Sequence, residues 1–247
     1  STATDAKAMI AMAEAAQDDL KNIRVTVAKL IFGQETVVER SLVAILAGGH
    51  ALLVGVPGLA KTKLVETLGT VLGLAERRIQ FTPDLMPADI IGSEVMDQSA
   101  DGKRSFRFIK GPVFSQLLMA DEINRASPRT QSALLQAMQE YHVTVAGERH
   151  DLPRPFHVLA TQNPLEQEGT YPLPEAQLDR FLMQIDVLYP ELDAERRILV
   201  ETTGIGSSSV SAVINPDRLS QMQTLVRSMP VPETVVDAIL KLVRAAR

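Results

Sequence analysis

One short segment of this 247-residue sequence has the residue types of a phosphate-binding loop. Residues 55–62 read Gly-Val-Pro-Gly-Leu-Ala-Lys-Thr and directly follow the apolar run 50–54. This order predicts a strand, a tight loop and then a helix that begins near Lys63. Backbone N–H groups of the loop and of the helix N-terminus can surround an anion. The segment therefore predicts a site for a nucleoside triphosphate.

Two side chains complete this loop chemically. Lys61 can reach the β- and γ-phosphates, and the Thr62 hydroxyl can bind Mg²⁺. The common pattern has glycine where this chain has Ala60, and an alanine fits if that residue has helical dihedrals. The alternative is a chance Gly/Pro turn that ends in Lys-Thr. The expected nucleotide-binding residues of the loop are Gly55, Pro57, Gly58, Leu59, Ala60, Lys61, Thr62 and Lys63.

Two adjacent carboxylates follow the apolar run 117–120. A buried strand that ends in Asp-Glu places both at the carboxyl edge of a sheet, where ligands bind in open α/β folds. Asp121 is then expected on the Mg²⁺ side, and Glu122 is expected to orient and polarise the attacking water. The alternative is a polar strand end that faces solvent.

Two further residues extend this pattern. Asn163 follows the apolar strand 156–161, and its amide can hydrogen-bond a γ-phosphate oxygen and the lytic water. An Asn-Pro turn is the alternative reading. Arg180 is expected to end a helix over 174–181, where it is either a cation favoured by the helix dipole or an arginine finger that stabilises phosphoryl transfer. The spacing does not decide between these two roles.

The elements that must position these residues alternate between strands and helices. Such alternation predicts a mostly parallel sheet covered by helices on both faces. Expected strands are 51–56, 78–82, 116–120, 156–161 and 182–187, and expected helices are 6–30, 35–48, 63–72, 128–141 and 174–181. Two hairpin-like stretches are expected at 93–109, with its turn at Asp101-Gly102, and at 142–157, with its tip at Ala146-Gly147.

The pattern changes near residue 190 and becomes all-helical. Helices are expected at 192–203, 216–228 and 232–247, with a linker at 204–211. We therefore expect three parts: an N-terminal helix (1–30), a nucleotide-binding core (31–190) and a helical lid (191–247). The chain stops at Arg247 in mid-helix without a cap, so the lid is expected to be incomplete.

Composition excludes several other classes of protein. The chain has no cysteine, which excludes disulfides and cysteine-based sites, and its net charge of −5 gives no global basic signature for nucleic acid. No apolar run approaches the 18 residues of a membrane span, and the N-terminus has no signal-peptide layout, so a cytoplasmic location is expected. The four histidines have no metal-ligand spacing.

The motifs together resemble the MoxR family of AAA+ ATPases. The residues that carry the resemblance are 55–62, Ala-Asp-Glu-Ile-Asn-Arg-Ala (120–126), Ala-Thr-Gln-Asn-Pro (160–164) and Leu-Pro-Glu-Ala-Gln-Leu-Asp-Arg-Phe (173–181). The resemblance implies an α/β fold, with a P-loop AAA+ αβα core, a mostly parallel sheet and a helical lid.

The resemblance also implies roles for single residues. Lys61 and Thr62 take Walker A roles and Asp121 and Glu122 take Walker B roles. Asn163 becomes sensor 1, and Arg180 the arginine finger. Phe32, Gly33 and Gln34 are expected near the adenine. The two hairpins are expected to face a ring pore, and the sensor-2 arginine is expected beyond Arg247.

The implied activity is hydrolysis of ATP to ADP with Mg²⁺, coupled to remodelling or maturation of a partner protein. The family implies a homo-oligomeric ring, expected to be a hexamer, and a partner with a von Willebrand factor A domain. The alternatives are a nucleic-acid motor, against which the acidic balance counts, and a nucleotide-dependent scaffold without turnover. A basic patch at Lys103, Arg104, Arg107 and Lys110 is either a solvated hairpin face or a pore surface. Met9 and Met12 are expected to pack in the core.

Overall fold

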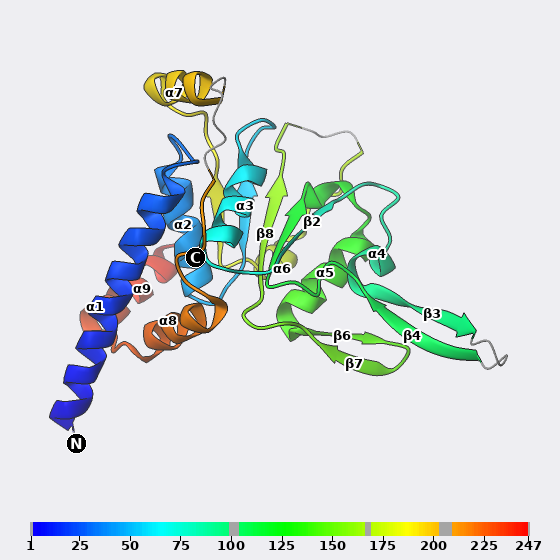
Figure 1. Ribbon diagram of the computed structural model, residues 1–247, viewed down its shortest axis with the longest axis horizontal. Helices are drawn as coiled ribbons and strands as arrows, with labels where there is room; N and C mark the ends of the chain where they lie inside the picture. The colour runs from blue at the N-terminus through cyan, green and yellow to red at the C-terminus, as the bar shows by residue number, and fades with distance from the viewer. Residues whose placement is uncertain (1, 99–103, 166–168, 203–208, 247) are drawn as a thin grey trace.

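The computed structural model describes residues 2–98, 104–165, 169–202 and 209–246 of the chain. Its centre is a five-stranded sheet in the order β2-β5-β8-β1-β9, in which every neighbouring pair is parallel. The strands are β1 (Ala51–Val54), β2 (Glu76–Gln80), β5 (Leu117–Asp121), β8 (His157–Gln162) and β9 (Met183–Asp186). The expected mostly parallel α/β fold is confirmed (Figure 1).

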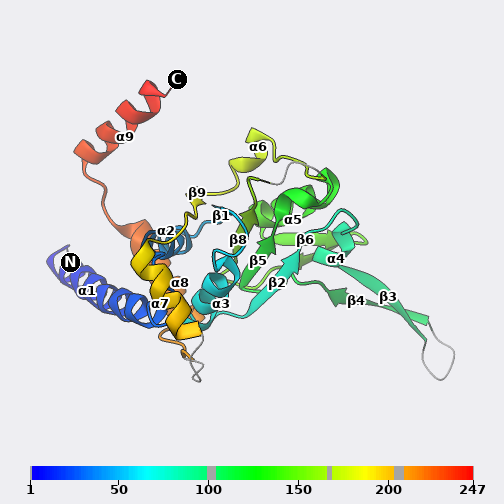
Figure 2. The same ribbon diagram turned by 90° about the horizontal axis from the view of Figure 1, so that it is seen from above.

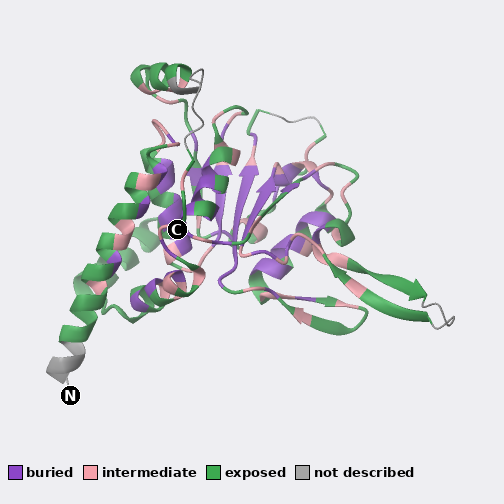
Figure 3. Cartoon of the chain, in the orientation of Figure 1, coloured by how far each residue is buried: buried purple, intermediate pink, exposed green. Residues whose placement is uncertain are grey.

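Both faces of the sheet are covered, which explains why its central strands read as continuous apolar runs. Successive residues of β5 point to opposite faces: Leu117 and Met119 pack in one core cluster, and Leu118 and Ala120 in the other. All five residues of β5 are buried, and Figure 3 shows the central strands as the buried interior of the molecule.

The helices divide between these two clusters. One cluster is formed with α1 (Thr2–Val27), α2 (Glu35–Leu46), α3 (Lys61–Val71) and α8 (Pro216–Ser228). The other is formed with α4 (Pro87–Ile91), the 3₁₀ turn η1 (Ile123–Arg125) and α5 (Pro128–Glu140). The remaining helices are α6 (Glu175–Leu178), α7 (Leu192–Thr202) and α9 (Glu233–Ala245), and Figure 2 shows α9 standing away from the sheet.

Two antiparallel hairpins project from the core, as the alternating stretches predict. They pair β3 (Gly92–Gln98) with β4 (Arg104–Lys110) and β6 (His142–Val145) with β7 (Glu148–Asp151). At the tip of the second, Ala146 and Gly147 have φ values of 49° and 85°, as a tight hairpin turn requires. The predicted turn at Asp101-Gly102 lies outside the described residues, as do Lys103, residue 203 of an expected helix, residues 204–208 of the expected linker and Arg247.

Four expectations about the elements were wrong in detail. The short helix α4 begins at Pro87, where no helix was expected, and a proline at its first position favours it. Helix α6 spans only four residues and ends before Arg180. Helix α3 begins at Lys61 rather than at Lys63.

The fourth concerns the N-terminal half of α1, which does not pack in the core. Met9 and Met12 are 36% and 46% exposed, whereas Ile23 and Val27, about three and four turns after Met12, are buried. Figure 1 shows the reason, because the N-terminal end of α1 extends beyond the helices α3 and α8 against which α1 packs. Among the described residues, no helix is both long and apolar enough to cross a bilayer.

Candidate active site

The loop 55–60 leaves the carboxyl end of β1, between β8 and β9. The Gly55 N–H donates to the carbonyl of Gln162, at 3.1 Å, and the Val187 N–H donates to the carbonyl of Val54, at 2.7 Å. A Cβ on Gly55 would lie 2.5 Å from the Val187 oxygen, so the first residue of the motif has room only for glycine. The neighbouring strands thus fix where the loop begins.

Ala60 corrects a premise of the sequence analysis. Its dihedrals are left-handed, φ 56° and ψ 22°, rather than those of a right-handed helix. A left-handed conformation costs an L-residue about 1–2 kcal/mol, so a glycine would be less strained at this position. Gly58 also has a positive φ, of 84°, with open space around its Cα. The loop reverses sharply before α3 and keeps its backbone accessible for an anion.

Lys61 is the first residue of α3, and its ammonium group folds back over the loop. Its Nζ donates to the carbonyls of Gly55 and Val56. Burial lowers the pKa of Lys61, and the nearby charges of Asp121 and Glu122 partly oppose that shift. The lysine therefore lies in the electrostatic field of both predicted Walker B carboxylates, and Thr62 follows it in the first turn of α3.

Asp121 ends β5 and is almost fully buried, with both carboxylate oxygens in use. Its Oδ2 accepts from Arg78 Nη2 and its Oδ1 from the Thr161 hydroxyl, each at 2.6 Å. The same Thr161 oxygen accepts the backbone N–H of Glu122 at 2.8 Å. Hydrogen bonds thus link the polar residues at the ends of strands β2, β5 and β8 directly.

Glu122 follows in a left-handed conformation, φ 54°, which turns its side chain out of the strand direction. Its Oε2 accepts from Gln80 Nε2 at 2.9 Å and from Arg125 Nη1 at 3.3 Å. Sequence reasoning missed Arg78, Gln80 and Arg125. The parallel register that pairs Gln80 with Asp121 was the available signal, because it brings the polar end of β2 to the same edge.

Asn163 lies directly after β8 at this same edge and is buried. Its Oδ1 accepts the backbone N–H of Leu165 at 3.1 Å, which fixes the direction of the amide group. Its Nδ2 has no protein partner in the part of the chain that the structure describes. Among the described residues the side chain is therefore oriented with its Nδ2 donor uncommitted, and this is the atom that a phosphate oxygen would need.

Arg180 lies at the opposite, amino edge of the sheet. It is exposed and lines a cavity of about 300 Å³ together with His50, which precedes β1. The Leu182 N–H donates to the carbonyl of His50 at 2.8 Å. The structure therefore does not bring Arg180 together with Lys61, Glu122 and Asn163 within one chain.

The segment Phe32-Gly33-Gln34 packs against the chain that leaves β9. Gln34 Nε2 donates to the carbonyl of Leu188 at 2.9 Å, and the Arg197 guanidinium lies 4.7 Å from the centroid of the Phe32 ring. Because Val187 pairs with Val54 beside the loop, this segment lies on the phosphate-loop side of the sheet. The adenine contacts of Phe32, Gly33 and Gln34 stay a prediction.

The donor set fits a nucleotide and its metal. Backbone N–H groups and an ammonium suit phosphate, and a hydroxyl with nearby carboxylates suits Mg²⁺, which prefers oxygen ligands. Among the described residues, no group of three or more His, Cys, Asp or Glu could hold a metal unaided. A Mg²⁺ ion here would therefore share its ligands with phosphate oxygens and water.

Comparison with known proteins gives the same reading. The model of the "ATPase family associated with various cellular activities (AAA)" matches residues 50–183. The chain is 47% identical to "Chaperone MoxR1" of Mycobacterium tuberculosis, over 90% of this chain and 58% of that protein. It is 40% identical to YeaC of Bacillus subtilis, over 89% of this chain and 68% of that protein.

A solved structure extends the likeness to the whole fold. The crystal structure of a candidate ATPase from Cytophaga hutchinsonii superposes with a TM-score of 0.88 and 40% identity, covering 98% of this chain and 73% of that one. The chain thus spans 58% of the length of MoxR1 but most of the solved relative. On its sequence, its fold and the arrangement of its phosphate loop and acidic strand end, the chain belongs to the MoxR family of AAA+ ATPases.

Proposed function

We propose that this chain hydrolyses Mg²⁺-ATP and uses the ATP cycle to remodel or mature a partner protein. The observation that carries the proposal is the meeting of three strand ends at one edge of the sheet. Lys61 comes from the loop after β1, Asp121 and Glu122 from the end of β5, and Asn163 from the end of β8. Phosphoryl transfer needs such a set of positioned charges and little covalent chemistry from the protein.

Each residue has a distinct role in this proposal. The loop backbone and Lys61 bind the phosphates, and Thr62 and Asp121 hold Mg²⁺, which neutralises phosphate charge when bound. Asn163 Nδ2 donates to the γ-phosphate or to the attacking water. Glu122 orients that water and accepts its proton, for which Oε2 has to exchange its bonds to Gln80 and Arg125 for a bond to water.

The assembly and the partner belong to the same proposal. An AAA+ ring is a head-to-tail assembly, so Arg180, at the amino edge, would meet the nucleotide of the neighbouring subunit. We assign residues 1–30 to an N-terminal helix, 31–190 to the ATPase core and 191–247 to a helical lid. The name of the relative MoxR1 supports a chaperone-like activity on a client protein.

The substitution Glu122→Gln tests the catalytic proposal. The amide keeps the size of the side chain but cannot accept the proton of water, so ATP affinity should stay within a few-fold and phosphate release should nearly cease. Glu14→Gln, an exposed glutamate on α1, is the matched control and should hydrolyse ATP normally. Phosphate release near the wild-type rate in Glu122→Gln would remove Glu122 from the mechanism. If phosphate release nearly ceases as expected, a pull-down with Glu122→Gln would identify the client.

A further inference from the structure

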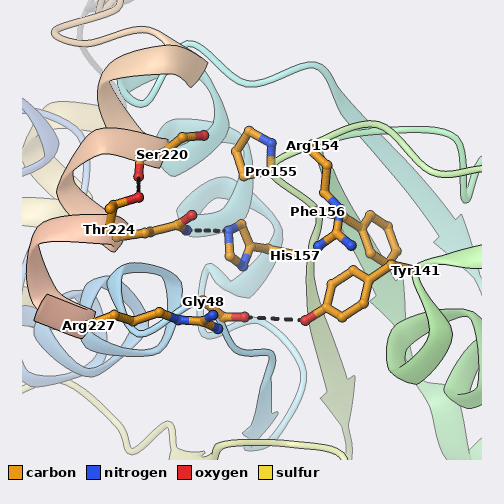
Figure 4. A pocket seen from close by; sticks show the side chains of 10 residues that line it. Gly48, Tyr141, Arg154, Pro155, Phe156, His157, Ser220, Thr224 and Arg227 are labelled. Atoms are coloured by element: carbon orange, nitrogen blue, oxygen red, sulfur yellow. Dashed lines mark hydrogen bonds between the residues drawn. The ribbon is translucent and has the colours of Figure 1, made fainter.

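A polar cavity of about 430 Å³ lies between helix α8 and the amino edge of the sheet (Figure 4). Its floor includes His157, the first residue of β8, and its wall includes Gly48, which precedes β1. The phosphate loop and Asn163 follow the other ends of these same strands. The cavity is therefore separate from the candidate active site, and none of the roles proposed above uses it.

Two arginines from different elements meet in this cavity. Arg154 precedes β8, and its guanidinium carbon lies 3.9 Å from the centroid of the Tyr141 ring. The Tyr141 hydroxyl donates to the carbonyl of Gly48 at 3.5 Å. Arg227, in the last turn of α8, brings its Nη2 to 3.4 Å from where a Cβ on Gly48 would lie. The two guanidinium groups thus flank one contact between Gly48 and Tyr141, as Figure 4 shows.

The cavity contains positive charge without a matching negative charge. No residue that lines it is an aspartate or a glutamate, and neither Arg154 nor Arg227 forms an ion pair within the described part of the chain. The Arg154 guanidinium lies over the ring of Tyr141, and its N–H groups make no hydrogen bond to the residues that the structure describes. Two like charges in one cavity favour an anion between them.

The neutral wall between the arginines is already ordered. His157 Nδ1 donates to the carbonyl of Gly49 at 2.8 Å, and its Nε2 accepts from Gln223 Nε2 at 2.9 Å. Burial lowers the pKa of His157, which keeps the ring uncharged and able to accept. Gln223 uses its second amide hydrogen to bind the carbonyl of Ile45 at 2.7 Å. A ligand would therefore enter a pre-formed pocket rather than order it.

We infer that this cavity binds a small phosphate-bearing anion, which Arg154 and Arg227 contact from two sides and which joins α8 to the sheet. Its volume lies within the usual range for small-molecule sites, roughly 300–1,000 Å³. Phosphate fits better than a single carboxylate, because it presents at least three acceptor oxygens to two guanidinium forks that approach from different directions. The site needs neither Lys61 nor ATP turnover.

Tyrosine fluorescence gives a reporter located in the cavity. The chain has no tryptophan and three tyrosines, so Tyr171→Phe combined with Tyr189→Phe leaves Tyr141 as the only emitter. Lys61→Ala is added to weaken phosphate binding at the loop. In the resulting protein, pyrophosphate at constant ionic strength and without Mg²⁺ should change the Tyr141 emission saturably.

Arg227→Gln should then weaken pyrophosphate binding about tenfold or more, since it removes charge-assisted hydrogen bonds without touching the tyrosine ring. Arg227 is exposed, so the variant should fold, and its far-ultraviolet circular dichroism should match the parent. Arg40→Gln, an exposed arginine on α2, is the matched control and should leave the affinity unchanged.

Three results would overturn the inference. An emission that pyrophosphate does not change saturably, or an unchanged affinity in Arg227→Gln, would show that the cavity is not an anion site. Equal affinity for citrate at equal ionic strength would contradict the assignment to phosphate chemistry. None of these outcomes bears on the turnover of Glu122→Gln, so the proposed ATPase is tested independently.

Discussion

At the carboxyl edge of the sheet the candidate active-site carboxylates have charged or polar side-chain partners, whereas three arginines at the amino edge have no carboxylate partner among the described residues. Asp121 pairs with Arg78, and Glu122 with Gln80 and Arg125. Arg180, Arg154 and Arg227 form no ion pair within the residues that the structure describes. The charges of the carboxylates at the carboxyl edge are therefore compensated within the chain, and in the two proposals above the arginines at the amino edge meet an anion supplied from outside it.

The largest effect expected from this difference is at Arg180. If the phosphates of a neighbouring subunit complete the amino edge, Arg180→Ala should lower ATP turnover by roughly 10³-fold or more and leave nucleotide affinity nearly unchanged. Mixing Arg180→Ala with Lys61→Ala should restore part of the activity, because some interfaces then pair an intact loop with an intact arginine. Phosphate release from mixtures of defined ratio measures this.

Arg40→Ala controls for the loss of a surface arginine. It should hydrolyse ATP normally by itself, without mixing with another variant. Rings that form in the mixture, yet never regain activity, would contradict an arginine finger that acts between subunits. Normal turnover in Arg180→Ala alone would return Arg180 to a structural role in the segment between α6 and β9.

The next largest effect is expected at the carboxyl edge itself. Lys61→Ala should weaken ATP binding by about 100-fold or more, because Lys61 is the cation of the phosphate loop and lies in the field of Asp121 and Glu122. Titration with a fluorescent ATP analogue measures the affinity. Lys21→Ala, an exposed lysine on α1, serves as the comparison for a lost lysine. An affinity equal to that of the wild type would place the nucleotide elsewhere.

A smaller effect is expected in the pH dependence of the free energy of unfolding, to which a buried histidine at the amino edge contributes. His50, at the amino edge, donates through Nε2 to the carbonyl of Met138 and accepts the Val158 N–H through Nδ1. Burial, followed by the nearby His157, lowers its pKa from 6.5 to about 4. The unfolded chain therefore binds this proton more readily between these values, so the free energy of unfolding should fall as the pH drops from 6.5 to 4.

The full loss from this group is on the order of 3 kcal/mol at pH 4, of which more than half should be present at pH 5. Urea unfolding at pH 7 and pH 5 measures it. His50→Gln should flatten the dependence, while His150→Gln, in the β6–β7 hairpin, should keep it. An unchanged slope in His50→Gln would mean that another group causes the loss.

The sequence predicted the carboxyl edge better than the amino edge, for a physical reason. Lys61 and Asp121 follow apolar strands, and all strands of a parallel sheet bring their carboxyl ends to one side. Local pattern and this single rule are enough to place them. The cavity at Arg154 and Arg227 depends on where α8 packs, and no local pattern around residue 227 specifies a contact with residue 48.

The finer geometry at the carboxyl edge was also beyond the sequence. The bond from Gln80 to Glu122 requires both the register of two strands and the left-handed backbone of Glu122. Ala60 adopts a conformation that its side chain disfavours, because the strand and the helix on either side determine where the loop must turn. Met9 is exposed because α1 extends beyond the helices against which it packs, and helical spacing alone does not reveal this length.

The attachment of α8 determines where the helical part of the chain can pivot. Leu219, Met222 and Leu225 are buried in the same cluster as α1 and α2, and Gln223 ties the helix to the start of β8. Helix α8 is therefore held against the core both by packing and by hydrogen bonds. The next segment, 229–232, is exposed and carries two prolines, which fix φ at two of its four residues. Any change in the orientation of α9 must come from the few remaining backbone torsions of this segment. The segment is therefore a short, stiff linker rather than a flexible one.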